Sequence, residues 1–176
     1  MIMPKRLLAL EIRASRFGFA VLEGPARLLD WGVRSFGEEQ KKVRSAVADR
    51  IATLLAFHKP FAVVVRLRKY HSAARNRRFL LTVAGIRTET MRHSTKFYAL
   101  TARQVRDRFA SNGQTTKHDI ATSLTEQFEE LSWRLPRRRK PYQSEAPVML
   151  VFDALANGLA FLRRRRPSDP NARQNS

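Results

Sequence analysis

The first part of the chain alternates hydrophobic and polar residues in the pattern of consecutive β-strands. The segment Leu7–Ala14 places Glu11 and Arg13 on one face and apolar residues at its even-numbered positions on the other. Two more strands are predicted over Phe17–Glu23 and Leu28–Phe36. Because the connections between these segments are short, we predict that they pair as an antiparallel meander.

A helix and a buried strand follow the meander. Five apolar residues of Glu38–Phe57 recur at i, i+4, i+8, i+11 and i+12, which is one face of a helix. The next segment, Phe61–Leu67, is almost continuously apolar, as in a central strand that is covered on both faces. Strand, long helix and strand together predict a parallel crossover, which places Phe61–Leu67 near the first strand.

The rest of the chain predicts helices and one edge strand. In chain order these are a helix ending at Gly85, an edge strand over Thr88–His93, helices over Ala99–Phe109 and Lys117–Trp133, and a final helix over Val148–Leu162. Thr116 is expected to cap the third of these helices, with Asp119 three residues further on.

This order of elements predicts an α/β fold. We expect a ribonuclease-H-like mixed sheet, three antiparallel strands and then parallel strands, flanked by helices. A flavodoxin-like fold is the main alternative, and the opening meander argues against it because doubly wound folds begin with a strand–helix–strand unit. The length of 176 residues suits one domain, which we place at residues 1–166, with residues 167–176 as a disordered tail.

The chain is strongly basic. It contains 34 Lys and Arg residues against 15 Asp and Glu residues, a formal net charge of +19. Most of these cations are arginines, whose guanidinium groups bind phosphate in a bidentate fork. We therefore expect nucleic acid as the partner, and a solvated basic surface is the plain alternative.

Several classes of site are excluded by what the sequence lacks. Without cysteine there is no disulfide, no thiolate zinc site and no cysteine nucleophile. The absence of cysteine also fits the cytoplasmic location that we expect. No apolar stretch reaches the roughly 20 residues that span a bilayer, so we expect no membrane partner. No HExxH, GxxxxGK[ST], GxGxxG or GxSxG motif is present.

Four segments in consistent order resemble the RuvC-type Holliday junction resolvases of the ribonuclease-H-like superfamily. They are Leu8–Val21, with Glu11 at the family's first acidic position and Gly18 at its glycine; His58–Arg66; Ala102–Ile120, where Arg103, Gln104, Val105, Gly113 and Lys117 fit the family's spacing; and Asp153–Ala156. The resemblance implies the fold predicted above, junction DNA as the substrate, a homodimer, and four acidic residues that hold two magnesium ions.

The acidic site departs from this family pattern. The second and third acidic positions correspond to Val64 and Leu150, so Glu11 and Asp153 are the remaining candidates for catalysis and metal binding. Two divalent cations bring four positive charges that two carboxylates balance poorly, and Arg66 adds another cation. We therefore expect no metal cofactor and a degenerate nuclease site. Mg²⁺ or Mn²⁺ would be needed only if the site is active.

Both remaining acidic residues also have plainer interpretations. Glu11 can form an ordinary surface ion pair with Arg13 or Arg66. Asp153 can be neutralised by the dipole of its helix or by an arginine. Asn157 lies one turn beyond Asp153 on the same face and can supply a neutral oxygen.

A basic segment with an aromatic residue follows the predicted central strand, and the segment that best matches the family adds further cations. Such a mixture suits nucleic acid, because cations hold phosphates while an aromatic ring stacks on a base. The candidate nucleic-acid-binding residues are Arg66, Arg68, Lys69, Tyr70, Arg75, Arg77, Arg78, Arg103, Arg106 and Lys117.

Three hypotheses follow. The leading one is a RuvC-like protein that binds branched or structured DNA and has an inactive nuclease site. The second is an active, metal-dependent, structure-specific endonuclease that uses Glu11 and Asp153. The third is an RNA-binding or assembly module on the same fold, since a fold does not determine a function.

Overall fold

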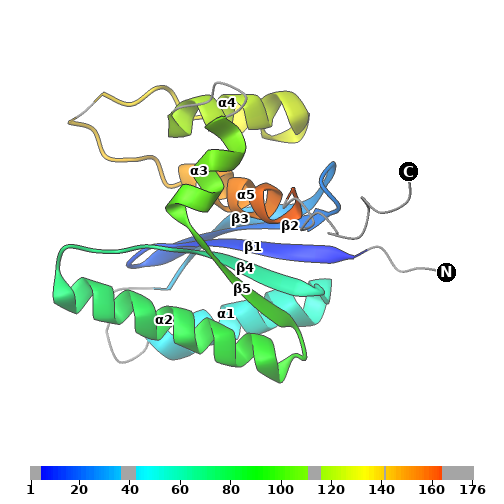
Figure 1. Ribbon diagram of the computed structural model, residues 1–176, viewed down its shortest axis with the longest axis vertical. Helices are drawn as coiled ribbons and strands as arrows, with labels where there is room; N and C mark the ends of the chain where they lie inside the picture. The colour runs from blue at the N-terminus through cyan, green and yellow to red at the C-terminus, as the bar shows by residue number, and fades with distance from the viewer. Residues whose placement is uncertain (1–4, 37–42, 111–115, 141, 164–176) are drawn as a thin grey trace, which may run out of the picture.

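The fold is built on a five-stranded mixed sheet with the strand order β3-β2-β1-β4-β5 (Figure 1). A computed structural model of the chain describes residues 5–36, 43–110, 116–140 and 142–163. The strands are β1 (Arg6–Ile12), β2 (Arg16–Glu23), β3 (Arg27–Ser35), β4 (Ala62–Leu67) and β5 (Lys96–Thr101). β1, β2 and β3 are antiparallel neighbours, and β4 and β5 continue the sheet parallel to β1. The predicted fold class and the crossover to β4 are confirmed.

Helices cover both faces of this sheet. They are α1 (Val43–His58), α2 (Ala73–Arg92), α3 (Ala102–Ala110), α4 (Lys117–Gln127) and α5 (Met149–Leu162), with a 3₁₀-helix η1 (Glu129–Arg134) after α4. α1 and α2 lie on one face, whereas α5 lies on the other face beneath α3 and α4 (Figure 1). No helix among the described residues is long and apolar enough to cross a membrane.

Each face of β1 is buried against a different helical layer. Leu7 and Ala9 belong to the core beneath α5, while Leu8 and Leu10 belong to the core above α1 and α2. All four side chains are fully buried. The next residue on the α5 side is Glu11, so strand alternation alone directs this carboxylate into the layer between the sheet and α5.

The edge strand predicted over Thr88–His93 is wrong, because α2 continues through this segment to Arg92. The threonine hydroxyls donate to the carbonyls one turn back, Thr88 to Ala84 and Thr90 to Ile86, which satisfies β-branched polar residues inside a helix. Gly85 lies in the middle of the helix rather than at its end. The actual edge strand is β5, which begins three residues after His93.

Other helix and strand boundaries differ from the predicted ones by a few residues. β5 extends to Thr101, so α3 begins at Ala102 rather than Ala99. α4 ends at Gln127 and is followed by η1, in place of one helix to Trp133. The start of the helix predicted from Glu38, Gly113 of the family-like segment and the predicted tail at 167–176 lie outside the described residues.

A cluster of acidic and basic side chains at the end of the central strands

The carboxyl ends of β1 and β4 meet at one edge of the sheet, and α5 crosses over them. Glu11 is the last residue but one of β1, and the parallel register pairs Leu10 with Val65, so Arg66 follows beside Glu11. Gly18 pairs with Glu11 on β2, and a Cβ atom at Gly18 would overlap the backbone carbonyl of Leu150 in α5. The glycine of the family-like motif therefore allows α5 to pack directly above this part of the sheet.

Glu11 is completely buried and both of its carboxylate oxygens accept hydrogen bonds. Oε1 accepts from Arg66 Nη2 at 2.8 Å and from Arg68 Nε at 2.8 Å. Oε2 accepts from Asn157 Nδ2 at 3.1 Å. The interpretation of Glu11 as an ordinary surface ion pair is therefore wrong: its partners are basic as expected, but the pair lies in the interior.

Asp153 lies on the first turns of α5, and its carboxylate faces three basic groups. Oδ2 accepts from Lys117 Nζ at 2.7 Å and from Arg13 Nη2 at 3.3 Å, and it lies 3.7 Å from Arg66 Nη2. The expected arginine salt bridge is present, and a lysine from another helix strengthens it. The dipole of α5 is thus not its only compensation.

A capping box at the start of α4 positions Lys117 next to Asp153. The Thr116 hydroxyl accepts from the Asp119 amide at 3.1 Å, and the Asp119 carboxylate accepts from the Thr116 amide at 3.0 Å. This confirms the predicted N-cap. A cation in the first turn of a helix is disfavoured by the helix dipole, and here two nearby carboxylates, of Asp153 and Glu145, offset that cost.

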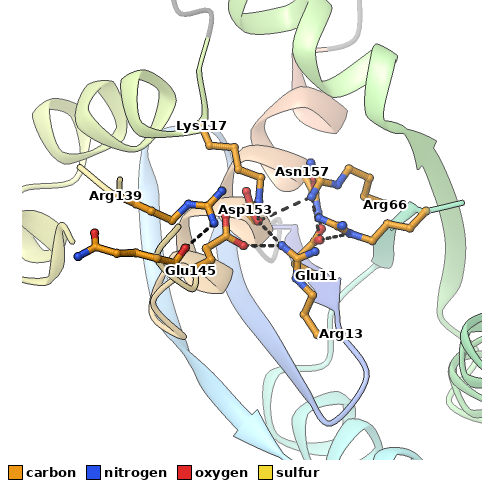
Figure 2. Close-up of polar contacts among 10 residues, drawn as sticks. Glu11, Arg13, Arg66, Lys117, Arg139, Glu145, Asp153 and Asn157 are labelled. Atoms are coloured by element: carbon orange, nitrogen blue, oxygen red, sulfur yellow. Dashed lines mark hydrogen bonds and ion pairs between the residues drawn. The ribbon is translucent and has the colours of Figure 1, made fainter. Parts of the chain in front are cut away.

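Glu145, which the sequence did not single out, is the third carboxylate of the cluster. It lies on the loop between η1 and α5 and bridges two cations from distant elements (Figure 2). Oε2 accepts from Arg13 Nη2 at 2.8 Å and Oε1 accepts from Lys117 Nζ at 2.8 Å. Strand alternation did place Arg13 on the same face as Glu11, but no local pattern marks Glu145.

The two buried carboxylates differ in their acidity. Burial by itself would raise the pKa of Glu11, but the charge and hydrogen bond of Arg66, with Arg68 and Arg13 nearby, outweigh it and hold that pKa below its ordinary value. Burial raises the pKa of Asp153, the charge of Glu11 raises it further, and Lys117 and Arg66 only partly oppose the rise. Glu11 is therefore the more firmly ionised of the two.

Glu145 is also more acidic than a free glutamate. Its partial burial would raise its pKa, but the hydrogen bond and charge of Lys117, followed by the charges of Arg13 and Arg68, lower it. At neutral pH the loop therefore presents a charged carboxylate to the cluster.

The cluster does not fit a pair of divalent metal ions. Three carboxylates already meet four cations, namely Glu11, Glu145 and Asp153 with Arg13, Arg66, Arg68 and Lys117. Mg²⁺ binds through oxygen atoms, and here both oxygens of Glu11, both of Glu145 and Oδ2 of Asp153 accept from arginine, lysine or asparagine. Within the described ranges no group of three His, Asp or Glu residues is arranged to hold a metal ion.

Strand β4 presents Val64 and Arg66 on the same face as Glu11. Val64 lies completely buried in the core beneath α5. Two residues further along β4 and on the same face, Arg66 is the side chain that reaches both Glu11 and Asp153. Val64 itself is apolar and lies too deep in this core to meet Glu11, and the side chain of β4 that does meet Glu11 is a guanidinium group. Leu150 is buried as well and packs against Gly18.

Several predicted nucleic-acid-binding residues share one cavity of about 440 Å³ between β4, α3, α4 and α5. The basic residues that line it are Arg66, Arg68, Lys69, Arg106 and Lys117. Asp153 lines it too, so the cavity opens directly onto the acidic and basic cluster. These five predicted cations come from two segments that lie far apart in sequence.

A second cavity, of about 510 Å³, lies between the β1–β2 turn and α2. Tyr70, Arg75 and Arg78 line it together with Arg13. The Tyr70 ring is half-buried and packs edge-on against Phe79 with the ring centroids 5.6 Å apart, so it forms a wall of the cavity.

Two predicted residues lie outside both cavities. Arg103 is exposed on α3 and pairs with Asp107 one turn further on, at 3.6 Å. Arg77 is exposed on α2 and lines neither cavity. Neither is brought to the cluster.

The fold is that of the Holliday junction resolvases. The sequence matches no protein-family model and no curated protein. RuvC from Thermus thermophilus, solved in complex with a Holliday junction substrate, is similar with a TM-score of 0.69 and 18% sequence identity over 89% of this chain and 91% of that one. The yeast mitochondrial Holliday junction resolvase gives a TM-score of 0.70 and 11% identity, over 91% of this chain and 78% of its own.

A viral relative is more distant. The fowlpox virus resolvase gives a TM-score of 0.53 and 12% identity, over 89% of this chain and 96% of its own. Three resolvases from a bacterium, a yeast mitochondrion and a virus thus share one architecture with this protein. The chain has the ribonuclease-H-like fold of RuvC and the other Holliday junction resolvases.

Proposed function

We propose that this protein binds branched or structured DNA through the basic end of its sheet and does not cleave it by two-metal hydrolysis. The observation that carries the proposal is the position of Arg66. Its guanidinium group lies between Glu11 and Asp153, the two carboxylates that remain where the resemblance to the resolvases implies a metal site.

The basic cavities support binding. The cavity next to Asp153 and the cavity next to Tyr70 both open at the carboxyl end of the central strands, and arginines line each of them. Arg75 and Arg78 form no ion pair with the described residues, so their charges are free to meet phosphates. The similar bacterial and viral resolvases were solved with Holliday junction DNA, which favours a branched ligand.

The charge balance supports the absence of cleavage. Two-metal hydrolysis needs two ions clamped around the scissile phosphate by anionic ligands. In this protein the cluster of Glu11, Glu145 and Asp153 is already overcompensated by one positive charge, because four cations face three carboxylates. A divalent ion would have to displace a buried guanidinium group whose own partner is the fully buried Glu11.

A junction-binding and cleavage assay tests the proposal. Purified protein is titrated into a labelled four-way DNA junction at several salt concentrations and incubated with Mg²⁺ or Mn²⁺. We expect binding whose log K falls with log salt by about 0.9 per neutralised phosphate, and intact DNA with either metal. Undetectable or salt-insensitive binding would contradict the first part.

The same assay separates the other hypotheses. Cleavage that Asp153→Ala abolishes would establish the active endonuclease. Structured RNA that competes better than the junction would favour the RNA-binding module. Equal competition by every nucleic acid would mean that the protein binds them non-specifically through a generic basic surface.

We also infer a homodimer, which the resemblance to the family implies. Leu80, Ala84 and Met91 lie exposed on one face of α2, and Phe57 of α1 is 77% exposed. Sedimentation equilibrium on the purified chain measures the mass, and a monomer at tens of micromolar would contradict this inference.

A further inference from the structure

The carboxylate of Glu145 is bound as a phosphodiester would be bound. Its two oxygens each accept from a different cation, Arg13 Nη2 and Lys117 Nζ, at 2.8 Å in both cases. The side chain of Glu145 is 29% exposed and that of Lys117 is 40% exposed, so solvent reaches the ion pair from one side. Figure 2 shows Glu145 reaching in from its loop to meet these two side chains.

The two cations do not depend on Glu145 for their positions. Both also bind Oδ2 of Asp153, Lys117 at 2.7 Å and Arg13 at 3.3 Å. The capping box at Thr116 additionally fixes the backbone at Lys117. If the loop carboxylate left, Asp153 would still hold the two cations together.

We propose that Arg13 and Lys117 form a phosphate-binding site which Glu145 occupies in the free protein, and that a backbone phosphate of the nucleic acid displaces Glu145 on binding. This inference rests on the proposed function and names one contact within it. Glu145 acts as a tethered competitor for the phosphate.

The exchange is electrostatically balanced. A phosphodiester carries one negative charge, as does the glutamate it replaces, so the net charge of the cluster does not change. The ion pairs of Glu145 are partly exposed, and such pairs contribute less stability than fully buried ones, which limits the cost of displacing Glu145.

The path to this site is open. A cavity of about 900 Å³ lies between α4 and the loop, and both Lys117 and Glu145 line it. The loop side of the same cavity carries Arg137, Arg138, Arg139 and Lys140. A polyanion that follows this basic wall arrives at the Glu145 carboxylate.

Removing the competitor should strengthen binding. We compare the parent with Glu145→Gln, which keeps the shape of the side chain but loses its charge, using fluorescence anisotropy of a labelled four-way junction at one salt concentration. The expected result is roughly three- to tenfold tighter binding by Glu145→Gln. Glu130→Gln is the matched control, because Glu130 is exposed on η1 and its removal changes the net charge equally.

A double-mutant cycle locates the effect. Glu145→Gln is combined with Arg13→Gln and, separately, with Lys117→Gln. In each of these backgrounds the gain in affinity from Glu145→Gln should fall to about the gain from Glu130→Gln, because one of the two phosphate-binding cations is missing. Equal gains from Glu145→Gln and Glu130→Gln, or a gain that survives both backgrounds, would overturn the inference. If no variant or parent binds any junction, the proposed function fails first.

Discussion

Arg66 is the residue on which the chemistry of the site depends. It lies on β4 beside Glu11, donates to that carboxylate at 2.8 Å and lies 3.7 Å from Asp153. A buried carboxylate without a partner is costly, and removing one member of a buried ion pair typically costs about 3–5 kcal/mol. Arg66 therefore stabilises the interior by neutralising the buried carboxylate of Glu11.

Introducing a carboxylate at position 66, beside Glu11 and Asp153, should create metal affinity. Arg66→Glu lowers stability in buffer, because Glu11 loses a partner and gains a negative neighbour. Millimolar Mn²⁺ should then raise the melting temperature of Arg66→Glu by about 3 °C, which corresponds to roughly 1 kcal/mol of binding linkage. Differential scanning fluorimetry measures the shift.

Arg66→Gln is the control for this substitution, since it removes the guanidinium group without adding a ligand. Neither Arg66→Gln nor the parent should respond to Mn²⁺. A comparable shift in the parent would show that its cluster binds metal, and the assignment of a degenerate site would then be wrong.

Glu11 should make stability depend on pH in a definite direction. Its pKa in the folded protein lies below the ordinary value of 4.5, so the unfolded chain binds the proton first as pH falls. The stabilisation from its ion pairs is complete above about pH 4.5 and is lost below it. Asp153, whose pKa is raised, acts in the opposite sense: its ionisation costs stability as pH rises through that pKa.

Glu11→Gln should therefore lower the free energy of unfolding at pH 7 by about 3 kcal/mol and flatten its decline in acid. Urea denaturation at several pH values between about 3 and 7 measures both effects. Glu145, whose pKa is also lowered, leaves a residual slope in the variant. A parent and variant with parallel pH profiles would contradict the buried pairing of Glu11.

At the scale of elements, α5 determines the geometry of the site. The helix is buried on all sides from Met149 to Ala160, because the sheet lies beneath it and α3 and α4 lie above it (Figure 1). Its N-terminal turn rests directly on Gly18, where a side chain would meet the backbone of Leu150. This close approach brings Asp153 and Asn157 within reach of the end of β1.

Gly18→Ala should be destabilising by about 3 kcal/mol or more, because α5 must shift to admit the methyl group. Gly85→Ala is the matched control: this glycine lies inside α2 with open space around its Cα, so alanine should stabilise the protein by about 0.5–1 kcal/mol. Urea denaturation of both variants measures the difference. If Gly18→Ala is neutral, α5 does not pack on the sheet as described.

At the scale of the whole molecule, the two ends of the sheet differ in the surroundings of their basic residues. At the end away from the cluster, Glu23 pairs with Arg6 at 3.5 Å and with Arg27 at 2.6 Å. At the end with the cluster, two basic cavities flank it. Long-range attraction of a polyanion should therefore be directed to the carboxyl ends of the parallel strands.

Replacing one cavity arginine should change the salt dependence of binding. Arg78→Gln should weaken junction binding and reduce the slope of log K against log salt by about 0.9, the loss of one phosphate contact. Arg27→Gln removes the same charge at the opposite end of the sheet and should leave the slope nearly unchanged. Equal effects of the two variants would mean that only net charge matters.

The sequence by itself determined the fold and the chemical character of the protein. The meander, the crossover to β4 and the family-like segments were predictable, because strand alternation and helical spacing are local patterns that burial imposes on neighbouring residues. The excess of arginine was visible in the composition. α2 was the exception, since its threonines favour strands intrinsically and only their hydrogen bonds one turn back reveal the helix.

The tertiary structure alone decided which charges meet. Arg13 and Glu145 are 132 residues apart in sequence, and Lys117 and Asp153 are 36 apart. Ion pairing depends on distances of a few ångströms and on burial, and both arise only when α4, α5 and the loop between them pack over the sheet. The sequence suggested Arg13 or Arg66 as the partner of Glu11, and only the packing decided that Arg66 and Arg68 donate to it in the interior.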